Sequence, residues 1–237
     1  MRSSNKKFEN YSPLIGIPLI LFLLFVFSMT GHPVFLNFIG FPKTGPVVFA
    51  LSRILYWVAV ILLWLYARKI EKQNLLIWEE RKYKLSHYVI SVIAIFGAVI
   101  LGMMIVKIIL HLIKLDESSS GSLVKIINIL RNNDLLIIFT AITAGVTEEL
   151  IFRGYIQPRL EIIFKNPYLA IIISSVLFGL LHYKYGTVIN VIGPFIIGII
   201  FSYYYWKYRS IKTLILFHTL WDLLSIYLHL KFANYKV

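Results

Sequence analysis

The sequence lacks cysteine altogether and has few acidic side chains. Without cysteine the protein has no disulfide framework, no thiol nucleophile and no thiolate metal site. Its 11 Asp and Glu are outnumbered by 24 Lys and Arg, which gives a formal net charge of +13. In a water-soluble protein this excess would favour nucleic-acid binding. Here the basic residues flank long apolar runs, so we predict membrane lipids as partners and no nucleic acid.

The mean hydropathy of +0.78 is far above that of water-soluble proteins. We therefore predict an all-α fold, a polytopic membrane bundle of about 7–8 transmembrane helices, because each span needs roughly 20 apolar residues. Arg53, in the second span, is expected to extend toward the membrane surface, the commoner arrangement, or to pair inside the bundle. The predicted spans are Tyr11–Thr30, Pro46–Ala67, Ser86–Ile113, a fourth that begins at Leu135 and runs through the Glu148-Glu149 pair, Tyr168–Tyr183, Val188–Trp206 and Thr213–Leu230.

The connections between the spans carry their own signals. The charged segment Arg68–Lys84 predicts a cytoplasmic loop with a short interfacial helix around Leu75–Trp78. Leu123–Leu130 is typical of an amphipathic connector. We expect Pro158 to interrupt the fourth helix and the mixed basic and apolar segment Arg159–Lys165 to lie at the membrane interface.

The distribution of basic residues predicts the orientation. The loops after the second, fourth and sixth spans are richer in Lys and Arg than the loop after the first span, where Lys43 stands alone. Because cytoplasmic loops carry the excess of Lys and Arg, we place the N-terminus in the cytoplasm. Seven spans put the C-terminus outside, and an eighth would bring it back. The composition favours a prokaryotic source, so we expect an integral protein of a prokaryotic cytoplasmic membrane.

Three charged residues interrupt the apolar fourth span. A charge at bilayer depth costs a few kcal/mol or more, so ionisable groups there are candidates for function. Glu149 and Arg153 are four residues apart and share a helix face, which predicts a buried ion pair. Glu148 points about 100° away and lacks that partner. One carboxylate is therefore expected to be structural and the other available for chemistry.

Histidines stand in two later spans. His182 lies about 16 residues after the Asn166-Pro167 turn and Glu148 about 18 before it, which places both at a similar height, roughly 24 and 27 Å away. His218 shares a helix face with Asp222, but it lies only about 12 Å from its own turn. The three heights agree only if the hairpin between the fourth and fifth spans projects further into the cytoplasm. Taken alone, either histidine is as often a hydrogen-bonded contact between two helices as a functional residue.

The motifs EExxxR, FxxxH and HxxxD, in this order in apolar helices, resemble those of the CAAX-protease and bacteriocin-processing (CPBP or Abi) family, which includes the type II CAAX prenyl endopeptidases. The resemblance runs roughly from Leu135 to Leu230. We accordingly divide the chain into N-terminal transmembrane helices and a connector, 1–133, and a catalytic helical core, 134–237. The resemblance implies a metal-free, glutamate-dependent intramembrane protease with the site residues Glu148, Glu149, Arg153, His182, His218 and Asp222.

Peptide hydrolysis needs a water, a base that activates it and donors for the developing oxyanion. We expect Glu148 and His182 to bind and deprotonate the water, and Arg153 to fix the second glutamate. His218, oriented by Asp222, would stabilise the oxyanion or protonate the leaving amine. The last position of the third motif is often Asn in prenyl endopeptidases, and it is Asp222 in this chain. An ionised Asp cannot donate a hydrogen bond as Asn does. Asp222 is therefore either protonated or limited to orienting His218.

Two alternatives to a metal-free protease are open. Glu148, His182, His218 and Asp222 are also the residue types that ligate zinc with a position left for water, although we expect no cofactor. A non-catalytic membrane scaffold or immunity protein would keep the bundle without the reaction. The predicted substrate is a membrane-associated peptide or protein, and the sequence does not show whether it is prenylated.

Overall fold

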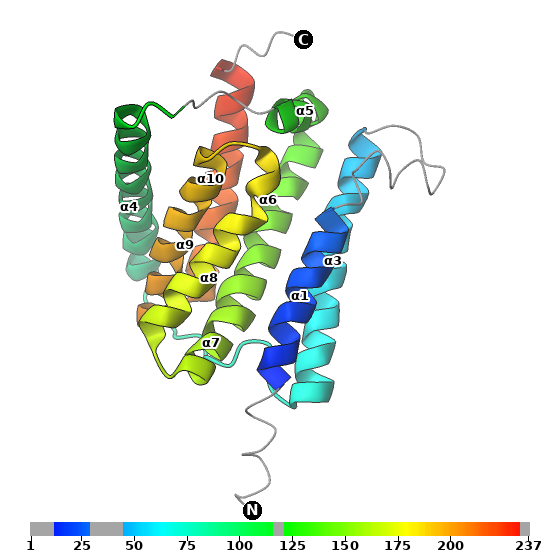
Figure 1. Cartoon of the computed structure of the whole chain (residues 1–237), viewed down its shortest axis with the longest axis vertical. Coiled ribbons are helices and arrows are strands. Elements are labelled where there is room, and N and C mark those ends of the chain that lie inside the picture. Colours follow the sequence, from blue (N-terminus) through cyan, green and yellow to red (C-terminus); the bar gives the residue numbers. More distant parts are fainter. Residues whose placement is uncertain (1–11, 29–44, 116–120, 233–237) are drawn as a thin grey trace, which may run out of the picture.

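The structure is a computed structural model that describes residues 12–28, 45–115 and 121–232. The fold over these residues is all-α, as the sequence predicts, and its long helices run up and down in a bundle (Figure 1). The helices are α1 (Ser12–Ser28), α3 (Pro46–Tyr66), α4 (Leu85–Leu112), α5 (Gly121–Leu130), α6 (Asp134–Glu149), α7 (Gln157–Phe164), α8 (Pro167–Leu181), α9 (Ile189–Tyr208) and α10 (Ile211–Phe232).

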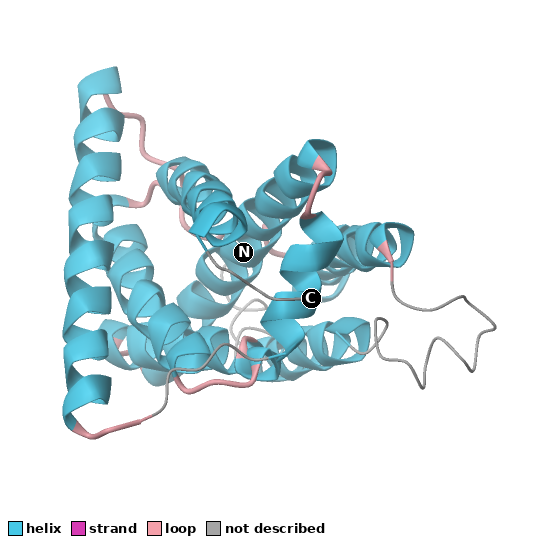
Figure 2. Cartoon of the chain, turned by 90° about the horizontal axis from the view of Figure 1, so that it is seen from above, coloured by secondary structure: helices cyan, strands magenta, loops and turns pink. Residues whose placement is uncertain are grey.

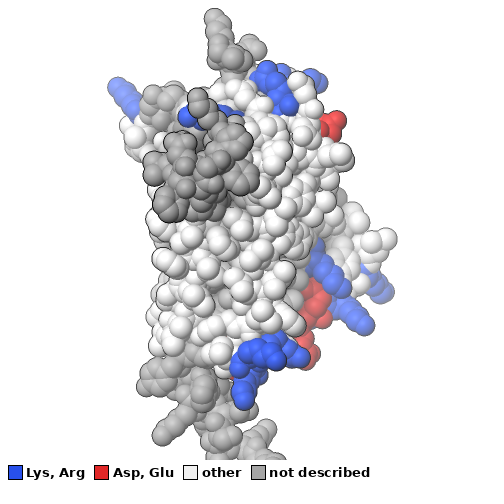
Figure 3. Space-filling model, turned by 90° about the vertical axis from the view of Figure 1, so that its right-hand side faces the viewer, with Lys and Arg blue, Asp and Glu red and all other residues white. Residues whose placement is uncertain are grey.

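Six helical segments are long and apolar enough to cross a membrane. They confirm the second to seventh predicted spans, whereas α1, at 17 residues, is shorter than these six. The predicted ends of the first span, at residues 11, 29 and 30, lie outside the described residues. The described part of the chain contains no eighth span. Charged side chains lie toward the two ends of the molecule, with an uncharged band between them (Figure 3).

The turns of the bundle are fixed by local signals. Asn133 caps α6 by accepting a hydrogen bond from the Leu136 amide at 3.0 Å. Asn166 caps α8 in the same way, because its side-chain oxygen accepts from the Tyr168 and Leu169 amides at 2.9 and 3.2 Å. Pro167 occupies the first turn of α8, where a missing amide hydrogen is harmless. The turn predicted at Asn166-Pro167 is therefore confirmed.

The helix of the glutamate pair does not stop where the sequence suggested. After α6 the backbone widens into a π-helix, η2 (Leu150–Ile156), and continues as α7 to Phe164. The expected interruption at Pro158 is therefore wrong: this proline lies in the first turn of α7, next to the wide π turn. In Figure 1 the hairpin of α7 and α8 reaches below the turn between α9 and α10, which meets the condition for Glu148, His182 and His218 to share a height.

A short π-helix, η1 (Ala67–Glu71), ends α3. The segment after it, residues 72–84, crosses beneath the bundle to α4 and is called the strap below (Figure 1). The strap contains no helix, so the interfacial helix expected around Leu75–Trp78 is wrong. Leu75 packs on a core formed mainly by α1, α3, η2 and α8, and Trp78 packs on a second core formed by α4, α9 and α10. These contacts replace the expected contact with the membrane surface.

Helix α4 stands at one edge of the bundle. Figure 2 shows it inclined strongly to the other helices, most of which are seen more nearly along their axes. It packs on α9 and α10 through Ile95 and Val99, which are 4% and 0% exposed. The short helix α5 lies across the end of the bundle opposite the strap (Figure 1).

Candidate active site

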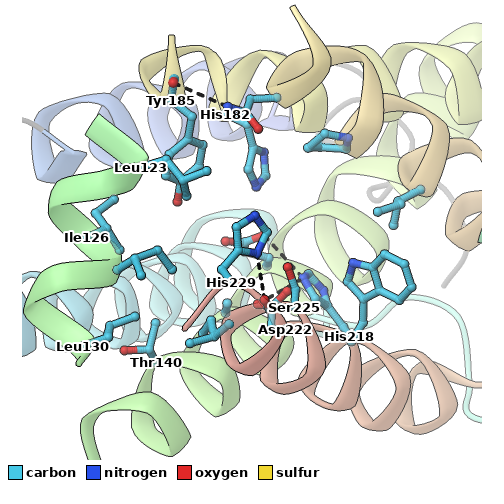
Figure 4. A pocket seen from close by; sticks show the side chains of 18 of the residues that line it. Leu123, Ile126, Leu130, Thr140, His182, Tyr185, His218, Asp222, Ser225 and His229 are labelled. Atoms are coloured by element: carbon cyan, nitrogen blue, oxygen red, sulfur yellow. Dashed lines mark hydrogen bonds and ion pairs between the residues drawn. The ribbon is translucent and has the colours of Figure 1, made fainter. Parts of the chain in front are cut away.

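A cavity of about 240 Å³ brings together residues from α6, α8 and α10. Glu148, His182, His218 and Asp222 all line it. In Figure 4 the ring of His182 enters from one side, while His218 and Asp222 approach from the facing helix α10 and α5 closes a third side. The height match predicted from helix lengths is therefore realised in three dimensions.

Glu149 joins two other site residues beneath this cavity. Its Oε1 atom lies 2.9 Å from a guanidinium nitrogen of Arg153 and 2.8 Å from Nδ1 of His218. The side chains of Glu149 and Arg153 are completely buried, so the predicted buried ion pair is confirmed. The Arg153 guanidinium is enclosed by aromatic side chains, with its carbon 4.3 Å from the ring centre of Phe178 and 5.1 Å from that of Phe201.

Glu148, by contrast, faces the cavity. It is 8% exposed, and its buried Oε2 atom has no hydrogen-bond partner among the described residues. Nε2 of His218 lies 3.9 Å from this oxygen, beyond hydrogen-bond distance. A buried carboxylate oxygen without a partner is costly in a folded protein, so it indicates a place reserved for a ligand.

His182 ends α8 and has a defined tautomer. Its Nδ1 atom lies 2.9 Å from the carbonyl oxygen of Phe178. Because a carbonyl only accepts hydrogen bonds, Nδ1 carries the hydrogen, and Nε2 of the neutral ring is left as an acceptor. The ring is held by edge contacts with Phe178 and tilted contacts with Tyr185, at centre distances of 5.0 and 5.7 Å. His182 therefore presents an unprotonated nitrogen from a fixed ring.

The same part of the chain matches a known family. The family described as type II CAAX prenyl endopeptidase Rce1-like matches residues 131–224. Those residues are an Rce1-like domain. The match confirms the resemblance that the three motifs suggest, and it includes all six predicted site residues. Comparison of the chain with curated proteins and with solved structures found no match. The division of the chain at residue 133 stays a prediction.

Asp222 of the Rce1-like domain has a different place from the one expected. Its carboxylate lies 3.8 Å from Nε2 of His218 and makes no hydrogen bond with it. Nδ1 of the same ring is held by Glu149. The residue that orients His218 is therefore Glu149 rather than Asp222. Asp222 lies on the side of the ring that faces Glu148, where its carboxylate is 28% exposed to the cavity.

Arg53 completes the cavity wall from outside the Rce1-like domain. Its guanidinium carbon lies 4.9 Å from the ring centre of Phe49 and 4.8 Å from that of Tyr56. It forms no ion pair with a described residue, and it lines the cavity together with the carboxylates. This differs from both expected arrangements of this residue. A single arginine in an apolar span was the available signal, but only the fold shows which way it faces.

The zinc alternative does not fit the arrangement of the side chains. Among the described residues, no three His, Asp or Glu side chains are grouped as a metal ion requires. We therefore derive no step through a metal.

Proposed function

We propose that the protein is an intramembrane endopeptidase that hydrolyses a peptide bond of a membrane-associated peptide or protein with an activated water. The observation that carries this proposal is the partnerless Oε2 of Glu148, buried in a cavity that it shares with His182 and His218. Membership of the Rce1-like family supports the same reaction class. Membrane lipids surround the bundle, and the site lies among its membrane-spanning helices.

The water lies between Glu148 and His182 in this mechanism. The carboxylate accepts one hydrogen of the water, and Nε2 of His182 is available to accept the other because Nδ1 already donates to Phe178. Removal of a proton by either group leaves a hydroxide directed at the substrate carbonyl. A positioned general base of this kind contributes about 10²–10⁴-fold to the rate.

His218 serves the other side of the reacting carbonyl. Its Nδ1 hydrogen bonds to Glu149, and Glu149 is held in turn by Arg153. With both ring nitrogens protonated, Nε2 of His218 donates to the oxyanion and then transfers its proton to the leaving amine. The ring is fixed before the substrate arrives, which is what makes such a donor effective. Glu149 and Arg153 act as positioning residues.

The test is cleavage of prenylated and unprenylated peptides by detergent-purified protein, with and without a chelator. The wild type is compared with Glu148→Gln, which keeps the shape of the side chain but removes the base. The matched control is Glu79→Gln, because Glu79 is an exposed glutamate on the strap. We expect cleavage by the wild type and the control that is unaffected by the chelator, and its loss in Glu148→Gln.

The outcomes separate the candidate functions. Equal cleavage by wild type and Glu148→Gln would overturn the assignment of the base, and loss of cleavage in the chelator would favour the zinc version. A cellular effect of the protein that survives both Glu148→Gln and His182→Gln would favour a scaffold or immunity protein. The preferred peptide shows whether the substrate carries a prenyl group.

A further inference from the structure

A second cavity adjoins the candidate site. Its volume is about 530 Å³, and it lies between α4, α9 and α10, with Met103 and Lys107 of α4 on its outer wall. The two cavities share part of their walls and lie side by side, and together they are called the groove below. The shared residues are Leu123, Asn190, Pro194, Ile197, Trp221, Ser225 and His229.

The groove belongs to one half of the bundle. Its walls come from α5, the segment between α8 and α9, and α10, with α3 and α6 beside the candidate site and α4 beside the second cavity. Of these, α5 and the connection between α8 and α9 lie at the end opposite the strap (Figure 1). Exposure also rises in that direction. Glu148 is 8% and His218 5% exposed, whereas Ser225 and His229, further toward this end, are half-buried. The groove therefore opens toward the end of the bundle at which α5 lies.

The opposite end is closed beneath the site by packed side chains. Residues of η2 and of the adjoining helices fill the space around and below Arg153, and each is almost inaccessible to solvent. Ile151, Phe152, Tyr155 and Ile156 are 0% exposed, as are Leu214 and Phe201, and Phe217 is 1% exposed. A peptide cannot reach Glu148 through this layer without unpacking the core.

The strap seals the same end a second time. Glu71, the residue just before the strap, binds Arg159 of α7 through its Oε2 atom, and Arg159 also donates to the backbone carbonyls of Asn74 and Leu75 in the strap at 3.2 and 3.1 Å. At its other end, Glu80 accepts hydrogen bonds from the Ser210 hydroxyl and the Ile211 amide, both at 2.8 Å. The strap is thus fixed at two points under the bundle.

The sealed end is also the more basic one. The described connections and helix ends there carry ten Lys and Arg, against six at the groove end, and the cytoplasmic side of a membrane protein holds the excess. The ten are Arg68, Lys69, Lys72, Arg81, Lys82, Lys84, Lys165, Lys207, Arg209 and Lys212, and the six are Lys107, Lys114, Lys125, Arg131, Lys184 and Lys231.

We infer that the groove opens on the extracytoplasmic side of the membrane, and that the substrate is a peptide segment located there. Such a segment belongs to an exported peptide or to the extracytoplasmic part of a membrane protein. A peptide that stays on the cytoplasmic side faces the strap and the packed layer instead of the groove. The cleavage itself rests on the proposed function, whereas the side on which the groove opens does not.

The absence of cysteine allows a direct test of the opening. Single cysteines are introduced at Ser225 in the groove, at Lys125 on the exposed face of α5 and at Lys82 on the exposed face of the strap. A membrane-impermeant maleimide is then added to spheroplasts of a bacterial expression host. We expect labelling of Ser225→Cys and Lys125→Cys, and labelling of Lys82→Cys only after permeabilisation. Labelling of Lys82→Cys alone in sealed spheroplasts would overturn the inference.

A second experiment follows the substrate. A cleavable peptide that cannot cross membranes is added to right-side-out and to inverted membrane vesicles that contain the protein, with Glu148→Gln as the inactive control. Hydrolysis by right-side-out vesicles, at least tenfold faster than by sealed inverted ones, is expected. Hydrolysis confined to inverted vesicles would overturn the inference. Absence of hydrolysis even after detergent is added would count against the proposed function instead, and the labelling result would stand.

Discussion

Two buried charged clusters lie on the same continuous helix, only one or two turns apart. In the cluster at the strap, Glu71 accepts from the Tyr155 hydroxyl at 2.6 Å and from Arg159 at 2.9 Å, and Arg159 also donates to backbone carbonyls. No side-chain nitrogen or oxygen of these residues is without a partner. In the cluster at the cavity, Oε2 of Glu148, Oε2 of Glu149 and Nε of Arg153 have no partner among the described residues.

The difference separates a structural cluster from a reactive one. A buried charge network with all its hydrogen bonds made rigidifies a fold and leaves nothing to bind a ligand. Of the three unsatisfied atoms in the other cluster, Oε2 of Glu148 belongs to a residue that lines the cavity, so it can meet a substrate or water there. Each cluster contains an ion pair between a glutamate and an arginine. The satisfaction of their hydrogen bonds, and the presence of a cavity, distinguish the two.

The sharpest test of this comparison is to remove one carboxylate from each cluster. We expect Glu148→Gln to lower kcat/KM by about 10²–10⁴-fold, because a general base is lost, with a melting temperature close to that of the wild type. Glu71→Gln should lower the melting temperature and leave kcat/KM of the folded protein unchanged. The measurements are peptide cleavage and thermal unfolding in detergent. Lost activity in folded Glu71→Gln would contradict the division into a reactive and a structural cluster.

A comparable effect on stability is expected at the strap. Arg159→Met leaves the buried carboxylate of Glu71 without its counter-charge, which costs about 3–5 kcal/mol. Unfolding of the purified protein in a denaturing detergent measures this loss. Lys165→Met removes an exposed positive charge just after the same helix and should leave stability unchanged. Equal stability of the two variants would show that the strap is not held by this pair.

Glu149 has both a structural and a catalytic role, so its substitution should lower both the stability and the activity. Glu149→Gln weakens the contact with Arg153, which is fully buried, and the hydrogen bond that orients His218. We expect a loss of about 3 kcal/mol in stability together with at least about a tenfold lower kcat, as expected when a catalytic imidazole is misplaced. Unchanged kcat in the folded protein would indicate that His218 does not need this contact.

The smallest effect is expected at Asp222. Asp222→Asn keeps the size of the side chain and adds a hydrogen-bond donor next to Nε2 of His218, so we expect kcat/KM to stay within about tenfold of the wild type. Asp222→Leu removes both hydrogen-bonding functions and should lower kcat/KM further, by about 10-fold or more. Identical kinetics of the two variants would show that Asp222 does not take part in the reaction.

The sequence predicts the features that depend on near neighbours in the chain. Apolar runs and the Asn166-Pro167 turn place the spans, and the four-residue spacing of Glu149 and Arg153 predicts their ion pair. The heights of Glu148 and His182 follow from helix lengths alone. Each of these signals needs only the geometry of a single helix or hairpin.

The remaining features depend on contacts between distant parts of the chain. Arg159 and Glu71 are 88 residues apart, and Glu149 and His218 are 69 apart, so neither contact has a local signal. Arg159 was therefore expected at the membrane interface, although it is completely buried. The π-helix η2 has no distinctive residue pattern either. Packing of Leu75 and Trp78 on the two cores overrides the interfacial helix that their apolar character suggests.

The strap and the packed layer above it have a kinetic consequence. With the floor of the groove closed within the described part of the chain, both fragments of a cleaved peptide leave by the opening through which the substrate entered. Each fragment occupies the path of the next substrate until it dissociates. Turnover should therefore slow as products accumulate, and added product peptide should inhibit competitively, whereas a channel open at both ends would release one fragment to each side.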